Sequence, residues 1–292
     1  MEHYPVMKEE SLEFLAIRPD GQYADLTAGL GGHTGAIARR LTTGSVISLD
    51  RDSESLELAK ANCSDCADRI RFRQSAFSGL TETLRSMGAG KLDGILADLG
   101  VSRMQLTSAE RGFTLMQAGP LDMRMDRRQE LTAAGVVNQS SERELSQLIM
   151  TFGEERRHRS EKIARALVRA RPIRDTGQLA DVVASVVPRS GKLHPATRVF
   201  QALRMVVNDE PGELDALLEQ APAWLAPGGR FVVIAFQSLD DRKVKTAFRE
   251  LGRLSRARIL TKHVVRPSET ETRQNPASRS AVLRALEMLA GV

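Results

Sequence analysis

The first hundred residues alternate short runs of β-branched and apolar residues with segments whose apolar positions recur at helical spacing. The runs predict strands near 22–26, 45–49, 70–74 and 92–98, and the segments between them predict helices near 33–43, 53–62 and 78–87. Strands that alternate with helices form βαβ units, in which neighbouring strands run parallel. The pattern therefore predicts a parallel α/β sheet at the start of the chain.

From about residue 104 the strand pattern gives way to helical patterns, which cover 142–152, 154–171 and 176–187. Alternation resumes near residue 210 with a helix to 225, a strand at 230–236, a helix at 239–251 and two closing strands near 257–265 and 279–287. We expect the closing strands to pair antiparallel at the sheet edge. The chain is therefore predicted to form one α/β domain from 1–103 and 209–292, interrupted by a helical domain at 104–208.

Composition places the 292 residues among ordinary globular proteins, with 41% hydrophobic and 27% charged residues. No stretch approaches the roughly 18 apolar residues that cross a bilayer, and the first residues lack the basic and then apolar order of a signal peptide. We therefore expect a cytoplasmic protein without a membrane partner.

The net charge of +5 is unevenly distributed, because residues 104–208 hold 17 Lys and Arg against 11 Asp and Glu, whereas the rest holds 25 against 26. A polyanionic partner would contact the helical domain. Within it, Lys162, Arg165 and Arg169 fall on one face of a predicted helix. The alternative is a solvated surface helix without a ligand.

The two cysteines form a single Cys63-Ser64-Asp65-Cys66 spacing, which is compatible with a redox pair or half a zinc site. No second pair exists, and these two follow the end of a helix, whereas a redox pair gains thiolate character at a helix N-terminus. We expect two reduced surface thiols and no metal site.

Glycines cluster between the first strand and the first helix, in the string Asp25-Leu26-Thr27-Ala28-Gly29-Leu30-Gly31-Gly32-His33. Glycines let the backbone approach a ligand, and the helix N-terminus that follows favours an anion or a nucleotide. The dinucleotide fingerprint fails by one residue, because Thr34 stands where the third glycine belongs. A dinucleotide, S-adenosylmethionine or an empty tight turn all remain possible at this stage.

Three further side chains follow strand ends. Asp50 ends the second strand, where a carboxylate accepts hydrogen bonds from ribose hydroxyls. Phe77, after the third strand, would cover an adenine face or belong to the core. Asp98 ends the fourth strand at the ligand-binding edge of the sheet, where the alternative to catalysis is a cap for the next turn.

The string Leu225-Ala226-Pro227-Gly228-Gly229-Arg230, followed by the apolar run 231–236, discriminates between the cofactors. A helix, a Pro-Gly-Gly turn, a buried strand and then a β-hairpin close the sheet of class I methyltransferases. This order favours S-adenosylmethionine over a nicotinamide cofactor.

The chain resembles the bacterial 16S ribosomal RNA cytosine-N4 methyltransferases of the RsmH or MraW family. The similar strings are His3-Tyr4-Pro5-Val6-Met7, Gly31-Gly32-His33, Asp98-Leu99-Gly100-Val101-Ser102, Ala109-Glu110-Arg111-Gly112-Phe113, Gly119-Pro120-Leu121-Asp122-Met123-Arg124-Met125, Gly153-Glu154-Glu155-Arg156, His194-Pro195-Ala196-Thr197-Arg198, Phe200-Gln201-Ala202 with Arg204, and Arg279-Ser280-Ala281-Val282-Leu283-Arg284. Departures from the family pattern are Arg103-Met104 before Gln105, Gln237 after Phe236, and Ala277.

The resemblance implies a Rossmann-like class I methyltransferase with an inserted helical RNA-recognition domain. It implies transfer of a methyl group from S-adenosyl-L-methionine to the N4 of a decoding-centre cytosine in the 16S rRNA of the small ribosomal subunit. The implied cofactor contacts are Gly31, Gly32, His33, Asp50, Phe77, Asp98 and Gln105. The candidate phosphate contacts are Arg124, Arg198 and Arg204. The oligomeric state stays open.

Asp98 is the expected catalytic residue. Its carboxylate and the Leu99 carbonyl would hold the amino hydrogens of the cytosine and localise the lone pair of N4. Methylation at C5 would need a cysteine nucleophile near this loop, and neither cysteine is there. The rival interpretations are a methyltransferase for another nucleic acid or a small molecule, and a binding module without turnover.

Overall fold

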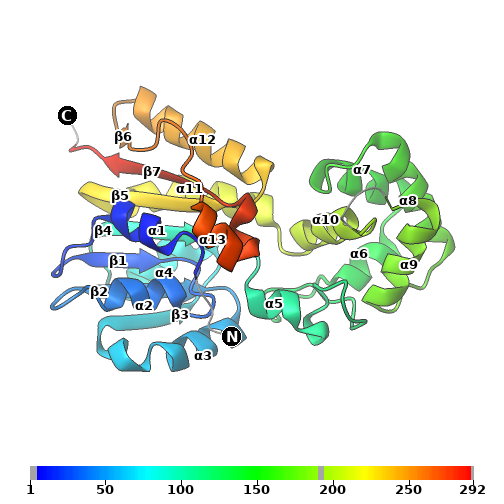
Figure 1. Ribbon diagram of the computed structural model, residues 1–292, viewed down its shortest axis with the longest axis horizontal. Coiled ribbons are helices and arrows are strands. Elements are labelled where there is room, and N and C mark those ends of the chain that lie inside the picture. The colour runs from blue at the N-terminus through cyan, green and yellow to red at the C-terminus, as the bar shows by residue number, and fades with distance from the viewer. Residues whose placement is uncertain (1–4, 190–193, 291–292) are drawn as a thin grey trace. The chain divides into compact units, whose positions relative to one another are not determined.

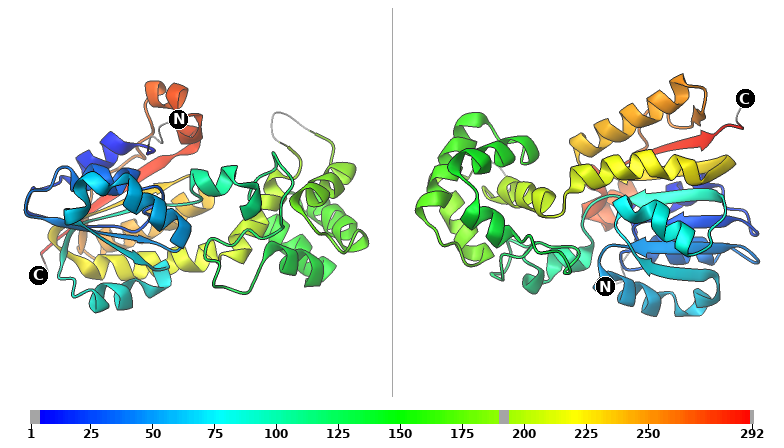
Figure 2. Two further views of the ribbon diagram at one scale, coloured as in Figure 1. Left: turned by 90° about the horizontal axis from the view of Figure 1, so that it is seen from below. Right: turned by 180° about the vertical axis from the view of Figure 1, so that it is seen from behind.

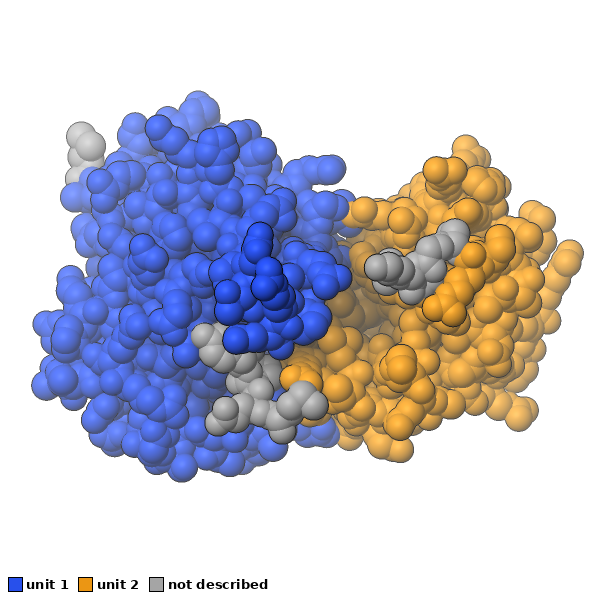
Figure 3. All heavy atoms as spheres, in the orientation of Figure 1, with its two compact units in different colours: residues 1–100, 211–292 blue, residues 101–210 orange. Residues whose placement is uncertain are grey.

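The computed structural model describes residues 5–189 and 194–290, so His3 and Tyr4 of the family-like start lie outside the described residues. The chain divides into two compact units (Figure 3). Unit 1 comprises Met1–Gly100 and Pro211–Val292, and unit 2 comprises Val101–Glu210.

Unit 1 is built on one seven-stranded sheet with the strand order β3-β2-β1-β4-β5-β7-β6 (Figure 1). The strands are β1 (Gln22–Asp25), β2 (Ser45–Asp50), β3 (Ile70–Gln74), β4 (Leu92–Asp98), β5 (Leu225–Ala235), β6 (Ala257–Ile259) and β7 (Val282–Met288). β1 to β5 pair in parallel, while β7 pairs antiparallel with both β5 and β6. The α/β fold and the antiparallel pairing of the closing strands are confirmed.

Helices cover both faces of this sheet. Their bounds are α1 (Lys8–Leu15), α2 (Gly32–Ala38), α3 (Ser53–Asn62), α4 (Leu80–Ser86), α11 (Glu210–Trp224), α12 (Ser238–Arg253) and α13 (Glu269–Gln274). Alternate strand residues point to opposite faces. One face packs against α1 and α2, whereas α4, α11 and α12 cover the other and lie in front of the sheet in the right panel of Figure 2. The result is a three-layer sandwich.

Two predicted boundaries differ from the structure at the last strands. The segment predicted as a strand to residue 265 forms β6 only as far as Ile259, leaves the ladder and returns at a single bridge between Val265 and Leu283. The Pro-Gly-Gly segment, predicted as a turn, lies within β5 as a bulge. There the register jumps from Leu92 opposite Leu225 to Gly94 opposite Arg230.

Unit 2 is helical throughout its described residues apart from loops and one isolated bridge between Pro120 and Asp175. Its helices are α5 (Arg103–Thr107), α6 (Ala133–Gln139), α7 (Glu142–Phe152), α8 (Arg157–Arg169), α9 (Thr176–Val186) and α10 (Thr197–Val207). Their apolar stripes form a separate core that includes Leu145, Ile163 and Leu203. Over the described ranges, no helix of either unit is both long and apolar enough to cross a membrane.

Candidate functional site

The glycine-rich turn after β1 is organised around the buried carboxylate of Asp25. Its Oδ1 accepts a hydrogen bond from the Thr27 backbone N–H at 3.1 Å, and its Oδ2 accepts one from the Thr34 hydroxyl at 2.6 Å. These bonds join the end of the strand to the first turn of α2. The turn is therefore held in place by hydrogen bonds within the protein itself.

Gly31 precedes α2 with a φ of +84°, a conformation that L side chains rarely adopt. A Cβ at this position would lie 2.8 Å from the Cys63 Sγ and 3.1 Å from the Ala59 backbone. Glycine is thus required both by the backbone conformation and by the close approach of α3.

The structure corrects the expectation of surface thiols, because Cys63 and Cys66 are both buried. Cys63 directly follows α3, faces the glycine turn, and donates from its Sγ to the Gly31 carbonyl at 3.3 Å. Burial raises the pKa of Cys63 to about 11. The two thiols are free, as expected, and this one belongs to the packing beneath the turn.

Asp50 ends β2 next to the same turn. Its Oδ2 accepts a hydrogen bond from the Gly29 backbone N–H at 2.8 Å, and its Oδ1 accepts one from the Asp52 N–H at 2.9 Å. An ionised carboxylate has about four acceptor positions, so two are left for ligand hydroxyls. Burial raises the pKa of Asp50 to about 6, although both backbone hydrogen bonds oppose the shift.

The loop after β4 meets the loop after β1 at one edge of the sheet. The two strands pair in parallel, with Asp25 opposite Leu96, and the Asp98 backbone N–H donates to the Thr27 hydroxyl at 2.7 Å. The two loops meet because both follow the carboxyl ends of parallel strands, as predicted for Asp98.

The Asp98 carboxyl group faces His33. Its Oδ2 lies 3.8 Å from the His33 Nε2, whereas its Oδ1 is buried without a hydrogen-bond partner among the described residues. Desolvation raises the pKa of Asp98 to about 8, and the charges of Asp25 and Glu271 add to the shift. A buried acceptor without a donor costs about 1–3 kcal/mol, which a ligand with a donor or a positive charge would offset.

Glu271, on α13, was not singled out from the sequence. Its Oε1 accepts a hydrogen bond from the Met7 backbone N–H at 2.8 Å, which ties the beginning of the described chain to a residue 264 positions away. Pro5 lies in the same segment, 3.0 Å from where a Cβ on Gly32 would stand. No local pattern in the sequence signals a contact over this separation.

The remaining predicted cofactor residues lie in different surroundings. Phe77 opens a short 3₁₀ turn after β3 and packs, partly buried, against the core of unit 1. Gln105 lies in unit 2, where it is buried in a capping box: its Oε1 accepts from the Ser102 N–H, and the Ser102 hydroxyl accepts from the Gln105 N–H. These two hydrogen bonds hold the glutamine at the start of α5, and its contact with the cofactor stays a prediction.

The three predicted phosphate contacts differ in their partners. Arg204 forms a bidentate pair with Glu210, at 2.7 and 2.9 Å, and its side chain is only 14% exposed. Arg124 is paired with Asp122 at 2.7 Å. Arg198, with 48% of its side chain exposed, lies 3.4 Å from Glu155, so it is the most accessible of the three.

The site of unit 1 fits a nucleoside cofactor that carries a positive charge. Gly31 holds the turn in a conformation that L side chains rarely adopt, Asp50 retains acceptor positions for ribose hydroxyls, and Asp98 presents a buried oxygen in need of a partner. S-adenosyl-L-methionine has both the ribose and the cationic sulfonium. No cluster of three or more His, Cys, Asp or Glu side chains suited to a metal occurs within the described ranges.

Comparison with known proteins assigns the family. The sequence matches the MraW methylase family over residues 1–289. It is 59% identical over 286 residues to ribosomal RNA small subunit methyltransferase H of Solibacter usitatus, covering 98% of this chain and 99% of that protein. The protein of the same name from Acidobacterium capsulatum is 48% identical, with 98% of each chain covered.

Among solved structures, an rRNA methylase from Streptococcus thermophilus aligns with a TM-score of 0.47 at 12% identity, covering 96% of this chain and 95% of that one.

Proposed function

Since this chain belongs to the MraW methylase family, we propose that it transfers the methyl group of S-adenosyl-L-methionine to the exocyclic N4 of a cytosine in the decoding centre of 16S rRNA. Relatives that share up to 59% of its residues over their whole length are named as small subunit rRNA methyltransferases. Their names support the substrate class. The choice of N4 and of the decoding centre rests on the sequence strings and on the chemistry of the Asp98 loop.

The cofactor would be held by unit 1. Gly31 and Gly32 would let its polar groups approach the N-terminus of α2, Asp50 would accept its ribose hydroxyls, and Phe77 would pack beside its adenine. When bound, the sulfonium supplies an electrophilic methyl group. The task of the protein is then chiefly to position the nucleophile, which can contribute about 7–11 kcal/mol.

The buried, unpartnered Oδ1 of Asp98 is the observation that carries the proposal. The amino group of cytosine is a weak nucleophile because its lone pair is delocalised into the ring. A carboxylate oxygen that accepts one amino hydrogen holds N4 in place and favours the rotated amino group, whose lone pair points at the methyl. The Leu99 carbonyl, one residue further on, would accept the second hydrogen.

The target base must leave its stack to reach such a site, which costs a few kcal/mol and less for an unpaired nucleotide. Unit 2 would hold the surrounding RNA through phosphate contacts, and its basic excess agrees with that role. Arg198 is the best placed of the predicted contacts. Arg124 and Arg204 would need to exchange their present carboxylate partners for phosphates.

Nucleoside mass spectrometry tests the proposal. Small ribosomal subunits that lack the modification are incubated with the cofactor and either the wild-type protein or Asp98→Asn, and the RNA is digested. We expect N4-methylcytidine with the wild type and a loss of rate of about 10²–10³ with the variant, because the amide presents a donor as readily as an acceptor.

Protein-free rRNA and duplex DNA serve as parallel substrates in this experiment. Methylation of DNA with none on rRNA would replace the proposal by a DNA methyltransferase, and methylation at C5 or on a ribose would refute the N4 assignment. Full activity of Asp98→Asn would remove Asp98 from the mechanism.

A further inference from the structure

The most basic part of unit 1 is a short segment. Its positive charge does not appear in the net charge of the whole α/β domain. Residues 242–266 hold nine Lys and Arg against one acidic residue, Glu250. The remainder of the α/β domain is acidic enough to cancel this excess, so the net charge of the whole α/β domain is close to zero. The segment comprises most of α12, β6 and the chain that leads towards α13.

Three of these cations lie on one face of α12. Arg242, Lys245 and Arg249 are spaced by three and four residues, so they follow one another along the helix surface. Val244 and Phe248 are buried and pack against the sheet. We call the three cations the α12 basic face. Like charges at this spacing destabilise a helix by about 0.2–0.5 kcal/mol per pair, so the arrangement is unfavourable for folding alone.

The nearby carboxylates are already paired with other cations. Glu250 is paired with Arg253 at 2.6 Å, and Asp241 forms a bidentate pair with Arg284 at 2.6 and 3.0 Å. Within the described ranges, the α12 basic face makes no ion pair with any carboxylate. Its three charges are therefore uncompensated within the described part of the protein.

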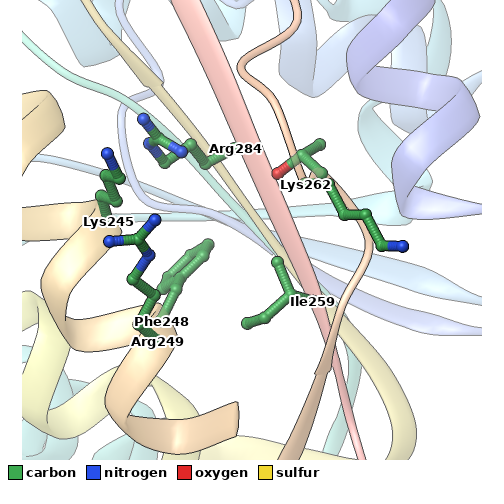
Figure 4. Close-up of a pocket in the computed structure, with 7 residues that line it drawn as sticks. Lys245, Phe248, Arg249, Ile259, Lys262 and Arg284 are labelled. Carbon is green, nitrogen blue, oxygen red and sulfur yellow. The ribbon is translucent and has the colours of Figure 1, made fainter.

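The α12 basic face borders a pocket between α12, β6 and β7, lined by Lys245, Phe248, Arg249, Ile259, Thr261, Lys262 and Arg284. In Figure 4, Lys245 and Arg249 project from α12 with their charged ends towards Arg284, while the Lys262 side chain extends away from them. Phe248 forms an apolar floor. Three cationic groups thus converge on one hollow, and only the charge of Arg284 is balanced.

We propose that the α12 basic face is a second RNA-binding site, which holds phosphates of the substrate RNA against unit 1. The choice of RNA rests on the proposed function, since a methylase that acts on rRNA brings a polyanion to its surface. Lys and Arg around a shallow hollow suit phosphate oxygens, whose contacts are dominated by charge and carry no base specificity. Phe248, the one aromatic residue that lines the pocket, is buried and offers no face for base stacking, so the site would anchor the backbone.

The test compares two double variants that remove the same charge. Lys245→Gln/Arg249→Gln removes two of the three charges of the α12 basic face, and Arg73→Gln/Arg85→Gln neutralises two exposed cations on β3 and α4 that make no ion pair with a described residue. Binding to small subunits and to protein-free 16S rRNA is measured across a series of salt concentrations. Methylation of the subunits and affinity for the cofactor alone are measured in parallel.

We expect the first double variant to bind both RNAs about tenfold more weakly, with a slope of log affinity against log salt that is smaller by about 1.5. Its KM should rise at unchanged kcat, and its cofactor affinity should equal that of the wild type. The Arg73/Arg85 variant should resemble the wild type in every measurement.

Equal binding by the two double variants, with the wild type active, would overturn the inference and leave the proposed function standing. A loss confined to assembled subunits would also overturn it, because a ribosomal protein would then be the partner. Conversely, a wild type that binds RNA through the α12 basic face but methylates none would refute the proposed function alone.

Discussion

The backbone N–H of Asp98 donates a 2.7 Å hydrogen bond to the hydroxyl of Thr27, across 71 positions of sequence. The same hydroxyl lies 3.3 Å from Asp25 Oδ1, so one side chain links the carboxylate that organises the glycine turn to the residue expected to hold the nucleophile. The distance between the cofactor turn and Asp98 is set by this link.

Removing the Thr27 hydroxyl should therefore impair turnover more than binding. Thr27→Val keeps the shape but leaves the Asp98 N–H without its acceptor, at a cost of about 1–3 kcal/mol. We expect kcat to fall about tenfold or more, because small misplacements at the reacting centre are costly. Thr27→Ser retains the hydroxyl and should stay near wild type. If both variants lose equal activity, the hydrogen bond is not the cause.

Cofactor affinity should depend on pH through Asp98. Its pKa is raised to about 8, so near neutral pH the carboxyl group of the free protein is mostly protonated. A cationic sulfonium binds best to the ionised form, and binding then releases a proton. Affinity for S-adenosyl-L-methionine should rise by up to about tenfold per pH unit and level off above about pH 8.

The affinity is measured by calorimetric titration at a series of pH values. S-adenosylhomocysteine, which lacks the positive charge, serves as the matched control ligand. Its affinity should show little of the rise. Parallel pH profiles for the two ligands, or an unaltered profile in Asp98→Asn, would argue against an ionisable Asp98 beside the sulfonium.

Glu271→Gln should move the same profile to lower pH. The carboxylate of Glu271 is one of the charges that raise the pKa of Asp98, whereas glutamine keeps an acceptor for the Met7 N–H. Removing the charge lowers the pKa of Asp98, so the pH at which affinity levels off should decrease. A profile that stays in place, with the fold intact by circular dichroism, would show that the two carboxyl groups do not interact.

Two glycines allow backbone strain to be separated from crowding. Gly31 and Gly228 both have positive φ, +84° and +78°, but a Cβ meets nothing within 4 Å at Gly228 and lies 2.8 Å from the Cys63 Sγ at Gly31. Gly228→Ala should cost about 1–2 kcal/mol of unfolding free energy. Gly31→Ala should cost about 1–3 kcal/mol more and weaken cofactor binding, as measured by denaturant titration with and without cofactor. Equal losses of unfolding free energy in the two variants would mean that α3 moves aside for the new Cβ at no energetic cost.

Substitutions of Arg204 and Arg198 should have different effects, the first chiefly on stability and the second chiefly on RNA binding. Arg204→Gln leaves the largely buried Glu210 without its partner, so we expect a loss of about 3–5 kcal/mol in unfolding free energy. Arg198→Gln should cost less, because the buried Glu155 keeps the Arg156 backbone N–H and Arg159 as partners, and it should lower the salt slope of RNA binding by about 1. A stable Arg204→Gln protein with a reduced salt slope would make Arg204 a phosphate contact after all.

Elements with strong local signals were predictable from the sequence. The helix predicted at 53–62 begins after Asp52, whose side chain caps it, and the helix predicted at 142–152 begins after Ser141 in a capping box. The predicted strand at 92–98 is a buried apolar run that ends at Asp98. Ligands bind at the carboxyl ends of the strands in open α/β sheets, so the strand pattern also predicted Asp50 and Asp98 as candidate site residues.

Features set by contacts between distant segments were not predictable. The cysteines are buried because α3 packs against the glycine turn, a tertiary contact that spacing does not reveal. The hydrogen bond between Met7 and Glu271 joins two residues that are 264 positions apart in the sequence. The α12 basic face was missed for a different reason, since charge was summed over domains larger than the surface on which it is concentrated.

The order of the strands has a consequence for the growing polypeptide. β4 lies at the centre of the sheet, but its neighbour β5 is supplied by residues 225–235, after the whole of unit 2 has been synthesised. Until those residues leave the ribosome, the edge of β4 has no partner and remains open to pairing with other chains. Unit 2, which is continuous, is free to fold first.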